Sequence, residues 1–473
     1  MENSKCLGFL IKPKNIRIVE QSRNPNWTYL ESQYMEYDIL IWGIGDISFY
    51  RDNTYVFSFP PTISREDRNI VLTIENNSIE IKNDWLGSLP VFYSKEGVIS
   101  TNMNYCLHDD IKSNSTNISK SGLIDYLNFG YCVFENTQFE NVKFLRYFST
   151  LTLDNEGLKI IHDIDPYPER IVQHPRSEES GVIQALNDDI NERIERGSFD
   201  NTILPLSGGL DSRFLLKGVR RKDKVRAYTY GVSKDQSASY EVQIAQSLCS
   251  MSGVQWTSIE LKEFTSYVEE WLSIFSTSVH LHGMYQMEFY SKMSEQMNVK
   301  NSILLSGIFG DIWASADNFI AVSSVSGLKK LGYTHGLNYA YNSAQHASNS
   351  ALNFFRDNYE YLNNQRVQPL MTVRLKIMLI SYLISVPEYY GIITVTPFLS
   401  FVNVVKMLSM DNERRRDRKW MREHLRDETS YSINRTKQMD YSNTLDFDVW
   451  SKYEFPRLVD FEFIKIPNKL KSG

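Results

Sequence analysis

The sequence predicts a mixed α/β protein with at least two domains. Its 473 residues exceed the usual size of a single domain. Residues 1 to about 160 are mostly short strand-like segments separated by turn residues, which predicts antiparallel sheets. From about residue 180 onward, short buried strands alternate with segments of helical periodicity. That alternation is typical of a parallel sheet covered by helices on both faces.

Composition excludes several classes of protein. The chain has 42% hydrophobic, 13% aromatic and 23% charged residues, which predicts packed cores rather than disorder. Its net charge of −6 predicts no nucleic-acid partner. The four cysteines, Cys6, Cys106, Cys132 and Cys249, form no Cys-x-x-Cys pair, so neither a zinc site nor a disulfide framework is expected.

Targeting signals are likewise not expected. The first residues are polar, and the longest apolar run, 377–386, is too short to span a bilayer and has a lysine at its start. We therefore expect a cytoplasmic protein that has no membrane partner.

The first 165 residues are predicted as one domain. Strands are expected at 37–44, 54–59, 70–74 and 79–81, and a short helix at 122–130 ends at Gly130. Residues 166–179 are rich in proline and charge and predict a linker. A second domain, 180–473, should begin with an amphipathic helix over 180–196.

The most informative stretch is 205–212, Pro-Leu-Ser-Gly-Gly-Leu-Asp-Ser, between a predicted strand (201–204) and a predicted helix. Gly208 and Gly209 allow backbone amides to approach an anion, and the helix that follows adds the positive end of its dipole. Asp211 is compatible with a bound phosphate only if a cation such as Mg²⁺ bridges the two. A Gly-Gly turn with capping serines is the plainer interpretation, but the placement between strand and helix favours a phosphate loop. It is not a Walker loop, because no Gly-Lys-Ser/Thr follows.

Two further strand ends carry candidate residues. A strand over 225–232 ends at Tyr230 and Gly231. A strand near 303–305 leads into the glycine-rich turn Ser306-Gly307-Ile308-Phe309-Gly310-Asp311. Ligands of parallel sheets bind beyond the carboxyl ends of the strands, so these turns are expected to lie beside the phosphate loop. Asp311 alone fits a helix N-cap equally well, but its partnership with Asp211 favours a functional role.

These segments, together with Asn434-Arg435-Thr436-Lys437-Gln438, resemble the ATP-pyrophosphatase domain of the asparagine synthetase family. The resemblance covers about 270 residues and implies ATP and Mg²⁺ as ligands. It implies that Asp211 and Asp311 hold the metal and that Asp311 and Lys437 are catalytic. The positions implied to bind ATP are Leu206, Ser207, Gly208, Gly209, Asp211, Ser212, Tyr230, Gly231, Ser306 and Gly307.

The first domain resembles the glutaminase domain of the same family at 82–93 and 122–142. The implied fold is an αββα sandwich of the N-terminal-nucleophile type, followed by an adenine-nucleotide α-hydrolase-like domain with a helical C-terminal part. That chemistry needs a cysteine at the mature N-terminus. Here Glu2 follows Met1, and Cys6 lies inside the chain. We interpret Cys6 as a small apolar residue of the first strand and predict an inactive glutaminase-like domain.

The second domain also departs from the family. Ile308 stands where the synthetases carry a glutamate, His282 stands where they carry a phosphate-binding arginine, and His280 or His282 could bind phosphate or act as a base. For either histidine alone, a surface or core role is the better prior. The basic stretch 414–422 predicts a helix whose charges mostly face solvent.

The resemblance therefore implies an ATP-dependent amide-bond-forming ligase acting on a small-molecule or peptide carboxylate. Relatives without the cysteine include β-lactam synthetases, lasso-peptide cyclases and amidotransferases, which favours a specialised pathway for a natural product, a peptide or a surface sugar. The nitrogen can come from free ammonia, from an ammonia-supplying partner protein or from an amine on the substrate, and the sequence leaves these alternatives open. It also leaves open whether the protein forms a homodimer. The alternative is a catalytically inactive, asparagine-synthetase-like binding protein.

Overall fold

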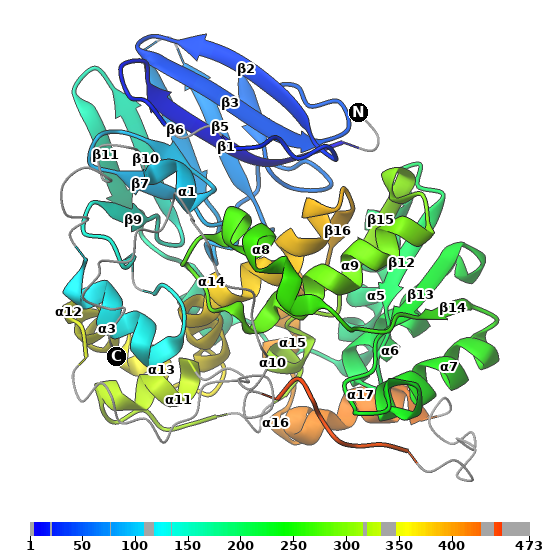
Figure 1. The fold of residues 1–473 in the computed structure, drawn as a ribbon. Coiled ribbons are helices and arrows are strands. Elements are labelled where there is room, and N and C mark those ends of the chain that lie inside the picture. Colours follow the sequence, from blue (N-terminus) through cyan, green and yellow to red (C-terminus); the bar gives the residue numbers. More distant parts are fainter. Residues whose placement is uncertain are drawn as a thin grey trace, which may run out of the picture.

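A computed structural model describes residues 4–18, 21–75, 77–107, 118–133, 135–315, 319–332, 347–426 and 439–446. Two antiparallel sheets form the first domain and one parallel sheet organises the second, as expected (Figure 1). The predicted fold class, an α/β protein that joins an antiparallel sandwich to a parallel-sheet domain, is confirmed.

The first antiparallel sheet has six strands in the order β2-β3-β1-β8-β7-β9. The second has five, in the order β11-β10-β6-β5-β4. In chain order the strands are β1 (Lys5–Pro13), β2 (Thr28–Tyr34), β3 (Tyr37–Ile44), β4 (Thr54–Val56), β5 (Ile70–Glu75), β6 (Ser78–Asn83), β7 (Phe92–Ser94), β8 (Ile99–Ser100), β9 (Val142–Phe144), β10 (Ser149–Asp154) and β11 (Gly157–His162).

An apolar core joins the two sheets. Phe9 and Ile11 of β1 belong to one cluster with Leu72 of β5 and Ile81 of β6, and all four are fully buried. Leu7 and Leu10 belong to the other cluster, which extends into the second domain. From Phe9 to Ile11 the side chains alternate between the two clusters, as expected of a strand buried on both faces, because successive side chains point to opposite sides.

Cys6 lies on the sandwich side of β1. The register of β1 against β3 shifts between Cys6 and Gly8, so Cys6 shares a face with Phe9 although the two are three residues apart. Its side chain is buried in the sandwich core, as expected of a small apolar residue in a first strand.

Short helices accompany the sandwich. α1 (Met103–Cys106) follows β8, and α3 (Lys120–Phe129) ends at Gly130, whose φ of 83° makes it a left-handed cap. The segment predicted as a linker instead contains α4 (Tyr167–Gln173). Tyr167 is buried between Trp85, Phe148 and Phe401, so its apolar contacts order a stretch whose composition predicts a loop.

The parallel sheet has the order β14-β13-β12-β15-β16. Its strands are β12 (Asn201–Pro205), β13 (Val225–Thr229), β14 (Gln255–Ser258), β15 (Ser302–Leu305) and β16 (Ile393–Val395), and every neighbouring pair is parallel. After β12 the chain adds β13 and β14 on one side of that strand, and it then adds β15 and β16 on the other side. The strand order therefore reverses between β12 and β15, and the turns that follow these two strands open onto the same crevice.

Helices cover the parallel sheet (Figure 1). The predicted helix over 180–196 is confirmed as α5. The described α-helices of the second domain are, in chain order, α5 (Glu179–Glu195), α6 (Leu210–Gly218), α7 (Tyr240–Ser252), α8 (Val268–Phe275), α9 (Tyr285–Gln296), α10 (Gly310–Ala314), α11 (Leu328–Gly332), α12 (Asn349–Asp357), α13 (Tyr359–Leu362), α14 (Gln368–Tyr389), α15 (Phe401–Leu408), α16 (Asn412–Arg415) and α17 (Lys419–His424); α11, α12 and α13 lie near α3 rather than on the sheet (Figure 1).

Helix α14 lies between the two domains. It is the one described helix long and apolar enough to cross a membrane, and 67% of its most apolar window is buried inside the protein. Arg374 on this helix donates through Nη2 to the carbonyl oxygen of Trp85 at 2.8 Å. Glu388 near its end forms a buried ion pair with Lys5 of β1. The apolar surface of α14 is thus core surface shared by both domains.

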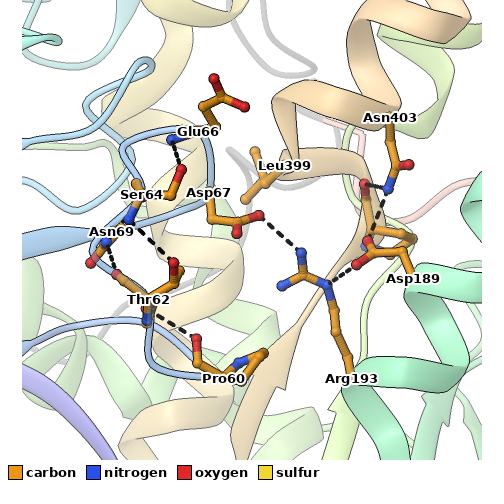
Figure 2. A network of polar contacts seen from close by, with 12 residues as sticks. Pro60, Thr62, Ser64, Glu66, Asp67, Asn69, Asp189, Arg193, Leu399 and Asn403 are labelled. Atoms are coloured by element: carbon orange, nitrogen blue, oxygen red, sulfur yellow. Dashed lines mark hydrogen bonds and ion pairs between the residues drawn. The ribbon is translucent and has the colours of Figure 1, made fainter. Parts of the chain in front are cut away.

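A second polar contact joins the domains near α5 (Figure 2). Arg193 reaches from α5 to Asp67 of the first domain at 2.9 Å and to Asp189 on its own helix at 2.7 Å. Asn403 of α15 donates to the other oxygen of Asp189 at 2.9 Å. The Arg193 side chain is 11% exposed, so its charge is neutralised mainly by these two carboxylates.

We expect Arg193→Met to lower the free energy of unfolding by about 3 kcal/mol, because it leaves Asp67 and Asp189 partly buried without their cation. Arg196→Met is the matched control on the same helix. Arg196 pairs with Glu192, both more than half exposed, and its loss should cost less than about 1 kcal/mol. Urea denaturation of both variants checks this, and equal effects would contradict it.

Candidate active site

The predicted phosphate loop is a closed turn between β12 and α6. The Ser207 amide donates to Ser212 Oγ at 3.2 Å, and the Gly209 amide donates to Ser207 Oγ at 3.1 Å. The two serines therefore hold the shape of the loop in addition to offering hydroxyl groups. A Cβ on Gly208 would lie 2.6 Å from the Tyr240 ring, so this position has no space for a side chain.

The start of α6 is open to a ligand. Its N-cap residue is Gly209, which is exposed, and no side chain caps the helix. The first amides of an α-helix have no partner within the helix, and they carry the positive end of its dipole. The glycines thus leave an anion-binding position where a capping side chain would otherwise lie.

Asp211, in the first turn of α6, packs against the turn that follows β15. A Cβ on Gly307 would lie 3.3 Å from Asp211 Cβ, and one on Gly310 would lie 2.4 Å from Asp211 Oδ1. These two glycines therefore allow the carboxyl group to sit against the turn. The structure brings together Ser207–Ser212 and Ser306–Asp311, two segments that are nearly a hundred residues apart.

The electrostatics of Asp211 are unfavourable in the free protein. Burial and the nearby Asp311 raise its pKa to about 7, while Arg418 opposes the shift. Its Oδ1 atom is buried without a hydrogen-bond partner in the described part of the chain. Its Oδ2 atom lies 3.4 Å from Nη1 of Arg418. Such an arrangement favours the arrival of an additional cation.

Two neighbouring residues have unusual backbone conformations. Phe309, in the turn after β15, has φ of 72°, and Arg418 has φ of 52°. Left-handed conformations are costly for residues other than glycine and concentrate at functional sites. Here Phe309 shapes the turn against which Asp211 packs, and Arg418 carries the guanidinium cation that lies near the Asp211 carboxylate.

The basic stretch 414–422 only partly matches its prediction. Arg416 and Arg422 are exposed and pair with Glu413 and Asp417, as expected of a solvated face. Arg415 is the exception: it is fully buried and donates to the carbonyl oxygens of Trp313 and Ser315 at 3.3 and 2.8 Å. Those carbonyls lie at the end of α10, where a cation also meets the negative end of the helix.

Tyr230 and Gly231 follow β13 at the same edge of the sheet. The Tyr230 hydroxyl accepts from Gln286 Nε2 at 3.0 Å, and its ring packs against Phe289 at 5.0 Å. A Cβ on Gly231 would meet the backbone oxygen of Gln236 at 2.3 Å. Leu206 is buried and its amide donates to the Tyr228 carbonyl at 2.8 Å, which fixes the phosphate loop beside this strand end.

Lys437 lies outside the described residues. The segment 439–446, which follows it, lies along the loop after β13: Asp440 accepts from the Tyr240 amide at 3.2 Å, and the Thr444 amide donates to Val232 at 2.7 Å. The chain therefore returns to the carboxyl edge of the parallel sheet shortly after Lys437.

A cavity of about 710 Å³ opens beside Asp311. It is walled by one face of α14, where Gln368, Thr372, Lys376, Leu379 and Leu383 recur at helical spacing. Ile308 and Ile312 of the Asp311 turn also line it, as do Tyr285 and Gln286 of α9. Burial lowers the pKa of Lys376 to about 8, while Asp311 acts to raise it. The size is typical of a small-molecule site.

His280 and His282 line this cavity but are poor phosphate ligands. Burial lowers the pKa of His280 to about 3, so it is neutral at physiological pH. His282 is 8% exposed, and its Nε2 lies 2.7 Å from the Leu445 carbonyl oxygen. These are the properties of core histidines. They favour a structural role for both residues over phosphate binding or action as a base.

The cysteine of the first strand is not arranged for nucleophilic chemistry. Burial raises the pKa of Cys6 to about 12, and the thiolate is the reactive form of cysteine. The side chain points into the sandwich core, away from the cavity of about 320 Å³ that lies between the domains and is lined by Leu7, Trp42 and Tyr389.

A magnesium ion fits the acidic pair. No group of three or more metal-ligating side chains occurs among the described residues, so these residues do not indicate a metal site built from protein ligands alone. Asp211 has an unpartnered buried oxygen and shares its electrostatic environment with Asp311. Magnesium is typically held by one or two carboxylates together with substrate phosphates, which matches this donor set.

Two residues of the site were not predicted. Lys376 had a usable signal, a lone basic residue at the start of an apolar run, spaced by four and eight from Thr372 and Gln368. Arg418 had none, because it is one of several cations in a basic stretch, and only the fold shows which of them faces Asp211.

Comparisons with known proteins give limited information. No family model and no curated protein matches the chain. Solved structures with local similarity include an NH3-dependent NAD synthetase from Campylobacter jejuni, with 16% identity over 40% of this chain and 80% of that one, at a TM-score of 0.22. Glutamine-dependent NAD synthetases from Acinetobacter baumannii and Cytophaga hutchinsonii have 16% and 10% identity. Those matches cover 41% and 49% of this chain and 42% and 44% of theirs, at TM-scores of 0.23 and 0.19. Similarities of this size do not establish a shared fold or activity.

We expect Asp211→Asn to stabilise the free protein. The folded state raises the pKa of this carboxyl from 3.8 to about 7, so at pH 8 it holds an unfavourable charge that asparagine lacks. Without nucleotide or divalent ions, the free energy of unfolding at pH 8 should rise by about 2–4 kcal/mol, since one pKa unit corresponds to about 1.4 kcal/mol. The gain should shrink as the pH falls from about 7 toward 3.8, and it should vanish below 3.8, where the carboxyl is protonated in both the folded and the unfolded state.

Asp223→Asn is the control, because Asp223 is exposed and pairs with Arg221 far from this turn. Denaturation curves that showed Asp211→Asn to be destabilising at pH 8 would contradict the electrostatic account of the site.

Proposed function

We propose that this protein is an ATP-dependent ligase that adenylates a carboxylate and transfers the acyl group to an amine or ammonia. One observation carries the proposal. A glycine-bearing loop at the N-terminus of α6 and an acidic turn after β15 meet at the point where the parallel strand order reverses, and Asp211 lies between them with an unpartnered oxygen.

In this proposal the loop Ser207–Ser212 holds the β- and γ-phosphates of ATP through its amides and hydroxyls, with Leu206 behind it. Tyr230 and Gly231 line the adenine side, and Ser306 and Gly307 contact the AMP portion. A magnesium ion held by Asp211 and Asp311 would neutralise the pyrophosphate charge. ATP at this edge agrees with the general rule for nucleotide sites in open parallel sheets.

The reaction has two steps. A carboxylate oxygen of the substrate attacks the α-phosphorus of ATP, the bond between the α- and β-phosphates breaks, and pyrophosphate leaves. An amine nitrogen then attacks the acyl carbon, the bond to AMP breaks, and the nitrogen loses a proton. Lys437 is proposed to stabilise the negative charge that develops in these steps.

The nitrogen source proposed here is ammonia or an amine carried by the substrate, rather than glutamine. The buried Cys6 and its raised pKa support this choice. A specialised biosynthetic pathway, cytoplasmic location, an ammonia-supplying partner and a homodimer remain proposals that follow from the sequence resemblance.

ATP–pyrophosphate exchange tests the adenylation step directly. With a library of carboxylic acids, we expect exchange that depends on the acid, and we expect no glutamate release from glutamine. Asp211→Asn should abolish exchange, whereas the exposed Asp223→Asn should not change it. Lys437→Met should slow exchange by ~100–1000-fold, the usual effect of removing one donor that stabilises a transition state.

The same assay separates the ligase from the inactive alternative, a nucleotide-binding protein without chemistry. Ile308 favours that alternative, because it places an apolar side chain on the cavity wall beside Asp311. The inactive alternative would be correct if the protein bound ATP but showed no exchange with any acid and formed no AMP in the presence of a metabolite pool.

A further inference from the structure

The cavity beside Asp311 carries an inference about the substrate, which rests on the proposed function. Its lining has more apolar than polar surface: the described apolar residues include Ile308, Phe309, Ile312, Phe319, Leu379 and Leu383, and uncharged polar residues such as Gln286, Gln368 and Thr372 lie among them. A site with this lining gains most of its affinity by removing apolar surface from water.

The charges of the cavity are few. Among the described residues that line it, Asp311 is the one carboxylate, and Lys376 and Lys330 are the two amines. Lys376 is half-buried, whereas Lys330 is exposed. His280 adds no charge at neutral pH.

Lys376 lines the same cavity as Asp311, the acid of the turn after β15. Asp311 is the group whose charge acts on it, and Asp311 in turn acts on Asp211 at the start of α6. No hydrogen bond or ion pair joins Lys376 to another described residue. Once Asp311 shares its charge with magnesium and pyrophosphate, the cation of Lys376 needs another anion, because a charge in an apolar cavity is costly without one.

We propose that the substrate is an apolar monocarboxylic acid whose carboxylate is bound by Lys376 and whose body lies along the apolar wall formed by Ile312, Leu379 and Leu383. A carboxylate at Lys376 would sit beside Asp311, next to the edge where ATP is proposed to bind. The cavity offers an α-ammonium group only Asp311 as a counter-charge, so free amino acids such as aspartate fit it poorly.

Calorimetric titration of the protein saturated with magnesium and pyrophosphate tests this without requiring turnover. The ligands are 3-phenylpropanoate, octanoate and dodecanoate, each paired with its primary amide, and aspartate. We expect at least one carboxylate to bind ~10–100-fold more tightly than its amide, as for a hydrogen bond to a charged group. Aspartate should not bind measurably.

Lys376→Met should remove that preference, and Lys376→Arg should retain part of it. Lys330→Met is the matched control: the same change of charge on the exposed rim of the same cavity should leave the preference intact. Binding of ATP with Mg²⁺ is measured on each variant and should not change, which keeps failure of this inference distinct from failure of the proposed ligase.

Absence of binding by every carboxylate, tighter binding of aspartate, or a carboxylate preference that Lys376→Met leaves unchanged would each overturn the inference. If Lys376→Met does not fold, the comparison of each acid with its amide on the wild-type protein still tests whether the cavity prefers a carboxylate.

Discussion

The partly buried Asp211 and the exposed Asp311, at the carboxyl edge of the parallel sheet, are the constraint on which the site depends. Asp211 and Asp311 arrive from the turns after β12 and β15, and the charge of Asp311 helps burial to raise the pKa of Asp211. The surroundings are shaped to keep them there: Gly307 and Gly310 leave the space that Asp211 occupies, and Arg418 supplies a partial counter-charge from a left-handed backbone. The unpartnered buried oxygen of Asp211 makes this arrangement one that an added cation would stabilise.

Helix α14 links this edge to the rest of the molecule. One face carries Lys376 and Leu379 into the cavity beside Asp311, and the opposite face carries Met378 and Ser381 to the cavity between the domains. The helix is fixed by polar contacts to the first domain, through Arg374 to Trp85 and Glu388 to Lys5. The wall of the proposed substrate site therefore depends on the antiparallel sandwich for its position.

The first domain therefore helps to position α14, and this role does not depend on any chemistry in the first domain. The strand that would present a nucleophile in an active glutaminase domain presents Lys5 to α14 and buries Cys6 in the sandwich. The Arg193 contact adds a second polar attachment between the domains. Burial raises the pKa of Cys6, which disfavours the reactive thiolate form of this cysteine.

The amino-acid sequence determined the local elements and the identity of the turns. Periodicity located β3, β12, α5 and the end of α3, because these signals depend on neighbours a few residues apart. Gly208 and Gly209 between a strand and a helix marked the phosphate loop for the same reason. Composition alone misassigned α4, whose order comes from Trp85 and Phe401, far away in the chain. Only the tertiary structure decided that Asp211 meets Asp311, that Arg418 and not its basic neighbours faces them, and that Lys376 lines a cavity. Such contacts arise when helices and strands distant in sequence pack together, and no local pattern records which side chains that packing will bring face to face.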